Sequence, residues 1–160
     1  MASVTIKNME RLLSRLQNIS EMDLTQTMNK ATALVHGQAK LLAPVDKGSL
    51  GASIHMKVNK VGMIIQGKVY TNLQYAPYVE FGTGIKGNGT YKHKLKDINL
   101  TYRDTPWVYT PDGGETFYRT EGQVAQPYMY PALSRNKKTI RNMFKVGIKD
   151  DLKSKCKGGK

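Results

Sequence analysis

The sequence has little cysteine, few acidic residues and no long hydrophobic run. Cys156 is the single cysteine among 160 residues, so the chain forms no internal disulfide and its fold does not depend on an oxidising compartment. Apolar runs such as Met63-Ile64-Ile65 are far shorter than the roughly 20 residues that cross a bilayer. Charges at Glu10, Arg11 and Arg15 interrupt the first apolar segment, which argues against a signal peptide. We therefore expect neither a membrane protein nor a disulfide-built secreted domain.

Positive charge is what the chain has in excess, with a net charge of +13. Residues 1–83 carry nine Lys/Arg against five Asp/Glu, and residues 84–134 carry six against five. Residues 135–160, in contrast, hold ten Lys/Arg against two Asp/Glu. Such a basic segment attracts nucleic acid, an anionic membrane or an acidic protein face. A solvated helix face would carry the same charges, and both interpretations stay open at this point.

Two helices are predicted before the first proline. Apolar residues recur at three-to-four spacing in the first segment, namely Ile6, Met9, Leu12, Leu13, Leu16 and Ile19. Asp23, followed by Gln26 three residues later, resembles a capping box and predicts the start of a longer helix. This helix should reach about Ala43, because Pro44 pushes the residue before it out of the helical conformation.

A β-hairpin is predicted next. Alternation of apolar and polar residues over 54–58 indicates a half-buried strand, residues 59–62 a turn, and residues 63–70 the returning strand. Two strands alone are marginal, so we expect this hairpin to pack on the long helix and to pair with a later strand. Candidates for that later strand are residues 107–109 and 116–118, joined by the turn sequence Pro111-Asp112-Gly113-Gly114.

The stretch from Tyr75 to Gly84 combines aromatic residues, one carboxylate and two glycines. Its apolar residues follow helical spacing: Tyr75, Tyr78, Val79 and Phe81. The spacing predicts a short helix with an apolar face, which Gly82 ends because glycine adopts left-handed conformations freely. Glu80 lies between apolar neighbours, so we expect it to point to water or to pair with a cation.

The remainder of the chain is predicted as a long loop followed by a helix. Residues 84–124 have little apolar periodicity and are expected to form a loop with a hairpin insertion, mobile in the isolated protein. Pro127 and Pro131 suit the first turn of a last helix. Its expected apolar stripe is Leu133, Ile140, Phe144, Ile148 and Leu152. Its basic positions, expected to contact DNA or a partner, are Lys137, Lys138, Arg141, Lys145 and Lys149. Residues 153–160 are expected to be a flexible basic tail.

These elements predict a single α+β domain over residues 1–160. The long helix and the C-terminal helix are expected to pack on a small, mostly antiparallel β-sheet. No internal repeat or linker divides the chain.

No catalytic, cofactor-binding or metal site is predicted. Gly82-x-Gly84-x-x-Gly87 matches the dinucleotide fingerprint as a string, but that motif requires a preceding strand and a following helix N-terminus. We expect the loop to continue through Asn88-Gly89-Thr90 instead. The histidines, His36, His55 and His93, are scattered without the paired spacing of a metal site.

Nucleophile and acid–base arrangements are equally unsupported. Cys156 lies in a lysine-rich tail that can lower its pKa, but no base can be named beside it. Asp46 and Ser49 share a turn, which favours local hydrogen bonds to the backbone. Glu80 has no second carboxylate near it in sequence. The sequence therefore predicts a protein without enzymatic activity.

Aromatic and basic residues are interleaved in the long loop, as in Tyr91-Lys92-His93-Lys94 and Tyr102-Arg103. Such mixtures stack on bases and contact phosphates in nucleic-acid-binding proteins. Tyrosine-rich loops also form protein interfaces, and the sequence signatures of known nucleic-acid modules are absent. We favour a protein interface here.

Three segments, taken together, resemble a bacteriophage family. Ala43-Pro44-Val45-Asp46-Lys47-Gly48-Ser49-Leu50, followed by Ala52-Ser53-Ile54, is similar to an A-P-V-D-T-G-x-L-x-x-S-I signature. Tyr75-Ala76-Pro77-Tyr78-Val79-Glu80-Phe81-Gly82-Thr83 is similar to a Y-A-x-Y-V-E-F-G-T core, and Gln126-Pro127-Tyr128-Met129-Tyr130-Pro131-Ala132-Leu133 to a Q-P-F-L-x-P-A-L helix start. The family is that of the tail-completion, or head–tail joining, proteins of phages with long non-contractile tails. Lys47 departs from the usual threonine, and the loop 84–124 is long for the family.

The resemblance implies a structural virion protein of the phage neck or tail, assembled in the host cytoplasm. It implies a homo-hexameric ring that joins the head connector or stopper to the tail terminator or tail tube, with double-stranded DNA passing through. The residues to which it assigns a structural role are Pro44, Asp46, Gly48, Leu50, Tyr75, Tyr78, Glu80, Phe81, Gly82, Pro127 and Pro131. Two alternatives remain open, a tail terminator ring and a nonspecific nucleic-acid-binding protein that uses the basic C-terminal helix.

Overall fold

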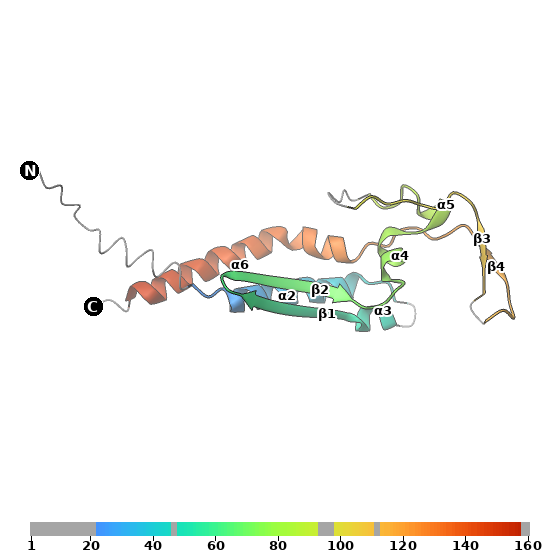
Figure 1. Cartoon of the computed structure of the whole chain (residues 1–160). Coiled ribbons are helices and arrows are strands. Elements are labelled where there is room, and N and C mark those ends of the chain that lie inside the picture. The colour runs from blue at the N-terminus through green and yellow to red at the C-terminus, as the bar shows by residue number, and fades with distance from the viewer. Residues whose placement is uncertain (1–21, 46–47, 93–97, 111–112, 158–160) are drawn as a thin grey trace, which may run out of the picture.

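A computed structural model of the chain describes residues 22–45, 48–92, 98–110 and 113–157 (Figure 1). The helix predicted from Ile6 to Ile19 and the turn residue Asp46 lie outside these ranges. The elements in chain order are α2 (Thr25–Leu42), α3 (Ser49–Ala52), β1 (Ile54–Val61), β2 (Ile64–Thr71), α4 (Ala76–Phe81), α5 (Gly84–Gly87), β3 (Trp107–Tyr109), β4 (Tyr118–Thr120) and α6 (Met129–Lys157). The predicted α+β class is confirmed.

Helix α2 is the element on which α3, both strands of the first hairpin and α6 pack. It ends as predicted: Ala43, the residue before Pro44, has an extended backbone with φ −61° and ψ 129°. The sheet approaches α2 closely at Gly67, where an added Cβ would lie 2.1 Å from the Thr32 hydroxyl oxygen. A side chain at position 67 would therefore push the hairpin away from the helix.

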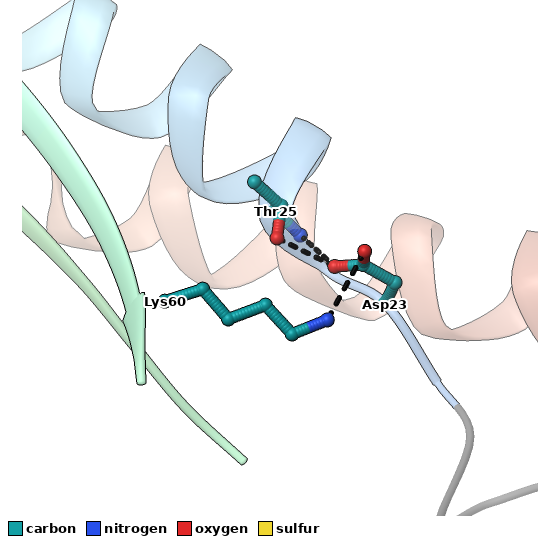
Figure 2. A network of polar contacts seen from close by, with 3 residues as sticks. All are labelled: Asp23, Thr25 and Lys60. Atoms are coloured by element: carbon teal, nitrogen blue, oxygen red, sulfur yellow. Dashed lines mark hydrogen bonds and ion pairs between the residues drawn. The ribbon is translucent and has the colours of Figure 1, made fainter. Parts of the chain in front are cut away.

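The start of α2 differs from the predicted capping box. The carboxylate oxygen Oδ1 of Asp23 accepts hydrogen bonds from the backbone N–H and the hydroxyl of Thr25, at 2.9 and 2.5 Å, and Gln26 takes no part. Lys60 in β1 pairs with the other carboxylate oxygen at 3.1 Å (Figure 2). These hydrogen bonds from Thr25, with the Lys60 charge, lower the pKa of Asp23 to about 2. The group ties the N-terminal end of α2 to the sheet.

The first hairpin is longer and its turn tighter than predicted. Strand β1 continues to Val61, which pairs with Ile64, so the turn consists of Gly62 and Met63 alone. Gly62 has φ 59°, the left-handed conformation that two-residue hairpin turns require. The prediction of a turn over residues 59–62 is therefore wrong, because glycine at the first turn position lets the ladder extend three residues further.

The expected pairing of this hairpin with a later strand is also wrong. Strands β3 and β4 pair only with each other in an antiparallel hairpin, with Tyr109 opposite Tyr118. Figure 1 shows this second hairpin beyond α4 at one end of the molecule, whereas the turn between β1 and β2 lies toward the opposite end. Both edges of the β1–β2 sheet therefore remain without a strand neighbour in the described part of the chain.

The core lies where the C-terminal half of α2, α3, α4 and the start of α6 meet. It is built largely from small side chains: Val35, Ala39, Ala43, Leu50, Ile54, Ala76, Tyr128 and Ala132. Tyr128 and Ile54 are the largest fully buried residues. No residue from 133 to 154 is buried, so most of α6 packs on α2 without being enclosed.

The apolar stripe predicted for α6 is partly wrong. Leu133 and Ile148 are exposed, whereas Ile140 packs against the core cluster. Gly147 faces α2 so closely that an added Cβ would lie 2.4 Å from the Thr27 hydroxyl oxygen. Small residues thus take part in the contact between α6 and α2, and a search for large apolar residues misses them.

Candidate assembly site

Glu80 is a buried carboxylate that holds the start of α6. It is 5% exposed, and its Oε2 accepts hydrogen bonds from the backbone N–H groups of Tyr128 and Met129 at 2.7 and 2.9 Å. Its Oε1 accepts a third hydrogen bond, from the Tyr130 N–H, at 3.1 Å. The first N–H groups of a helix have no hydrogen-bond partner within the helix and carry partial positive charge. A carboxylate accepts their hydrogen bonds and its negative charge offsets theirs.

The prediction for Glu80 is therefore wrong. The side chain neither points to water nor pairs with a cation, because three backbone amides from a segment 48 to 50 residues further along the chain surround it. Ala76, one helical turn earlier on α4, is buried beside it, whereas Tyr75 and Tyr78 are 41% and 57% exposed. The buried face of α4 is thus the one that bears Glu80, and the tyrosines are left at the surface.

Two tyrosine hydroxyls respond to the enclosure of this charge. Burial, and then the nearby Glu80 carboxylate, raises the pKa of Tyr128 to about 12. The same two causes, in the same order, raise the pKa of Tyr91 to about 12. Loss of either proton would place a phenolate near the carboxylate in a site with little water, so both phenols keep their protons to a higher pH than an exposed tyrosine.

The three glycines that match the dinucleotide fingerprint allow another segment of the chain to pack closely against them. Residues 121–125 cross over Gly82, Gly84 and Gly87, where added Cβ atoms would lie 2.5 to 2.9 Å from backbone atoms of that segment or of Gly82. The crossing is fixed by hydrogen bonds between Thr83 and Gln123 in both directions, at 2.9 and 3.1 Å. The one-turn helix α5 lies within the motif itself, residues 88–90 after it form a turn as expected, and the preceding element is α4, so no strand leads into the motif. The arrangement is therefore not that of a dinucleotide site.

Gly122 is a residue of this crossing that the sequence analysis missed. It has φ 96°, and an added Cβ would lie 1.9 Å from the Thr83 carbonyl oxygen. Nothing in the local sequence around Glu121-Gly122-Gln123 marks a chain crossing, because the partner residues are about 40 positions away.

A surface groove of 1260 Å³ lies between the body and the β3–β4 hairpin. Its walls include Pro44, Val45, Gly48 and Leu50 from the first signature segment, Tyr75, Tyr78, Phe81 and Gly82 from the second, and Trp107 and Tyr109 from β3. The hydroxyl oxygens of Ser49 and Tyr75, 2.8 Å apart, share a hydrogen bond that joins the two signature segments. Residues that are 30 positions apart in sequence thus line one surface.

The other predicted motif residues occupy defined positions. Gly48, with φ 74°, precedes α3, and Leu50 is 4% exposed in the core. Pro127 precedes α6 and Pro131 lies in its first turn, where a proline costs no hydrogen bond. The structure thus gathers Glu80, Pro127 and Pro131 at the joint between α4 and α6.

The basic residues of α6 form a separate surface. Lys137, Lys138, Arg141, Lys145 and Lys149 are all exposed. At 3.6 residues per turn they fall within about one third of the helix circumference, on the side opposite Ile140 and Gly147. The ion pairs found in the described part of the chain, Lys60–Asp23 and Lys86–Glu121, do not involve them. We call these five residues the basic stripe.

The described residues offer little that resembles a reaction centre. They contain no group of three or more His, Cys, Asp or Glu side chains placed to hold a metal ion. Among the described helices, none combines the length and the apolar character needed to cross a bilayer. What the described residues build is a buried joint, a surface groove and a basic stripe.

Comparison with known families gives a match over part of the chain. Residues 4–82 match the family described as "Bacteriophage HK97-gp10, putative tail-component", so this part of the chain is similar to a phage tail component. The matched range contains the first signature segment and the second up to Gly82, and the third, at residues 126–133, follows it. The resemblance to phage tail proteins is therefore confirmed. No curated protein and no solved structure matches the chain.

Proposed function

We propose that the chain is a structural subunit of the phage neck, without enzymatic activity. In this proposal several copies, six in the family's usual form, close into a ring that joins the head connector or stopper to the tail terminator or tail tube. The family match to a tail component supports the proposal, and so does the role of Glu80. The carboxylate at the centre of the family-like motif is buried and accepts hydrogen bonds from three backbone amides, a structural role that holds the start of α6.

The test is a phage that lacks this gene, supplied with the protein in trans. We expect the deletion to yield filled heads and separate tails, and the supplied protein to restore joined, infectious particles. Electron microscopy of the particles, with immunogold labelling of the protein at the neck, gives the readout. Joined and infectious particles in the absence of the protein would refute the proposal. Label along the tail tube or at its distal tip would refute the neck position.

The basic stripe supports a second candidate, contact with double-stranded DNA. Five exposed cations along four turns of one helix suit a phosphate backbone, either inside a ring or in a nonspecific nucleic-acid-binding protein. Phosphate binding loses affinity as salt rises, with a log–log slope of about −0.9 per neutralised phosphate. Replacing Lys138, Arg141 and Lys145 by Gln should flatten that slope by about 3. If this triple variant and a control with Lys57→Gln and Lys68→Gln gave equal salt slopes, the basic stripe would be excluded as the DNA-contacting surface.

A further inference from the structure

A cleft of about 660 Å³, separate from the surface groove, runs along the contact between α2 and α6. On α2 its described lining residues belong to the start of the helix, where Thr27 approaches Gly147 of α6. On α6 they extend from Thr139 to Ser154. Figure 1 shows this part of the α2–α6 pair at the end of the molecule away from α4. We call it the helix cleft.

The α6 side of the helix cleft has the pattern of a packing surface, but it is open. Its residues recur at spacings of three and four over about four turns, which is the stripe that a helix turns toward a neighbour. None of them is buried, and Val146 is 56% exposed. Val146, Met143 and Leu24 give the cleft an apolar surface. The α2–α6 pair thus leaves a seam that a third helix would cover.

The helix predicted for residues 6–19, which lie outside the described ranges, is attached beside this seam. Its apolar residues form one stripe, from Ile6 to Ile19. Five residues, 20–24, separate Ile19 from the start of α2 at Thr25. Connections of this length join helices that are antiparallel neighbours, so the segment should fold back along α2. The β1–β2 sheet and α6 already pack on α2, and the helix cleft opens beside its start.

The lengths of the segment and of the helix cleft agree. At 1.5 Å per residue, a helix over residues 6–19 is about 21 Å long, and the α6 side of the cleft spans about 22 Å. The match to the phage tail component begins at residue 4, so it takes in this segment together with α2. The segment and the helix that it would lie against therefore belong to one matched unit.

Charge gives a weaker argument in the same direction. Asp150 and Asp151 are the acidic residues of the basic segment 135–160, and both line the helix cleft, as does Lys30. Asp23 lines it too, but pairs with Lys60. Residues 6–19 hold three cations against one carboxylate, namely Lys7, Arg11, Arg15 and Glu10. The cations therefore face a cleft that carries more negative charge than the rest of α6.

We propose that residues 6–19 form a helix that occupies the helix cleft of the same chain and packs on both α2 and α6. The same chain is the favoured occupant because the five-residue connection holds the segment beside the cleft at an effective concentration of about millimolar, above that of a second copy in dilute solution. The basic stripe lies on the other side of α6, so the docked helix leaves it exposed. The inference does not depend on the proposed function.

Cysteine cross-linking of the dilute, full-length protein tests the contact. In a Cys156→Ser background, Leu13→Cys and Val146→Cys should be joined within one chain by a short bifunctional maleimide, because a helix antiparallel to α2 brings residue 13 level with residue 146. Ser14→Cys with Val146→Cys is the matched control, since Ser14 lies opposite the apolar stripe. The first pair should react at least about tenfold faster, whereas an undocked segment on the same tether would give both pairs similar rates.

Three results would overturn the inference. Similar rates for the two pairs would show a tethered segment that does not dock. Absence of product in both pairs would place the segment away from the helix cleft. Dimers formed by mixing the single variants Leu13→Cys and Val146→Cys would show that the cleft takes the segment of a second copy.

Hydrogen exchange of α6 gives a second measurement. Leu16→Lys should lower the protection of amides 146–154 at least about tenfold and leave the amide of Ala132, in the core, unchanged, because the cover of the helix cleft is lost and the core is kept. Ser14→Lys, which adds the same charge on the opposite side of the predicted helix, should change neither. Equal protection of amides 146–154 in the wild type and in Leu16→Lys would contradict the docking of residues 6–19.

Discussion

Two carboxylates lie at the starts of the two long helices, and we expect them to stabilise the fold to different extents. Glu80 is buried and accepts three backbone N–H groups of α6 from a distant part of the chain. Asp23 is exposed and accepts its hydrogen bonds from Thr25, two residues away, with Lys60 as a partly exposed ion pair. Both carboxylates therefore connect segments that are distant in sequence, but Glu80 does so from a buried site through three backbone hydrogen bonds and Asp23 through an exposed ion pair. Burial makes the difference.

The largest effect should come from Glu80→Ala. It leaves three N–H groups without an acceptor, at about 1–3 kcal/mol each, and two of the three are only partly buried, so the free energy of unfolding should fall by about 3–5 kcal/mol, the lower part of the summed range. Such a loss is a large part of the stability of a small domain. Urea denaturation measures it, and Glu121→Gln, on an exposed and long ion pair, is the control with an expected change below about 0.5 kcal/mol. Equal losses in the two variants would remove the distinction between buried and exposed carboxylates.

Gly122→Ala should have the next largest effect. Its Cβ would overlap the Thr83 carbonyl oxygen, and φ is 96°, so we expect a loss of about 2–4 kcal/mol or detachment of the 121–125 crossing. Gly89→Ala is the matched control, because Gly89 has φ 71° but no atom within 4 Å of an added Cβ. It should cost only about 1 kcal/mol of backbone strain. Similar losses in both would mean that the crossing does not constrain the glycine.

A smaller effect should appear at alkaline pH near Glu80. The pKa of Tyr128 is raised from 10.0 to about 12, so between these values the unfolded chain releases the phenol proton and the folded chain retains it. The unfolded state then binds fewer protons, and stability falls as pH rises from 10 to 12. Tyr128→Phe should lessen this fall, as measured by urea denaturation at several pH values. A Tyr128 phenol that titrates at the ordinary value of 10.0 would contradict the enclosure.

The smallest effect belongs to Asp23. Its pKa is lowered from 3.8 to about 2, so its contribution is present above pH 3.8 and is lost as pH falls through about 2. Asp23→Asn should therefore lower the melting temperature slightly at neutral pH and leave it unchanged below pH 2, with a smaller change than Glu80→Gln gives. If Asp23→Asn lowered the melting temperature as much as Glu80→Gln, the expected difference between the two carboxylates would be contradicted.

The sequence carries enough local information to predict α2 and the first hairpin. Pro44 ends a helix by local sterics, and alternation over β1 needs no distant partner. The environment of Glu80 could not be predicted from the sequence, because its three hydrogen-bond donors lie 48 to 50 residues away and are backbone groups, which side-chain patterns do not reveal. Gly122 was missed for the same reason. The separate pairing of β3 with β4 follows from their position beyond α4, which only the three-dimensional path of the chain determines.

The most direct test of the Glu80 joint is amide hydrogen exchange at Tyr128, Met129 and Tyr130, followed by NMR. We expect these three amides in the wild-type protein to exchange as slowly as those of the α2 core around Ala39, and in Glu80→Ala to exchange fast while Ala39 stays protected. Fast exchange of the three amides in the wild type, at the rate of the exposed Gly89 amide, would contradict the account.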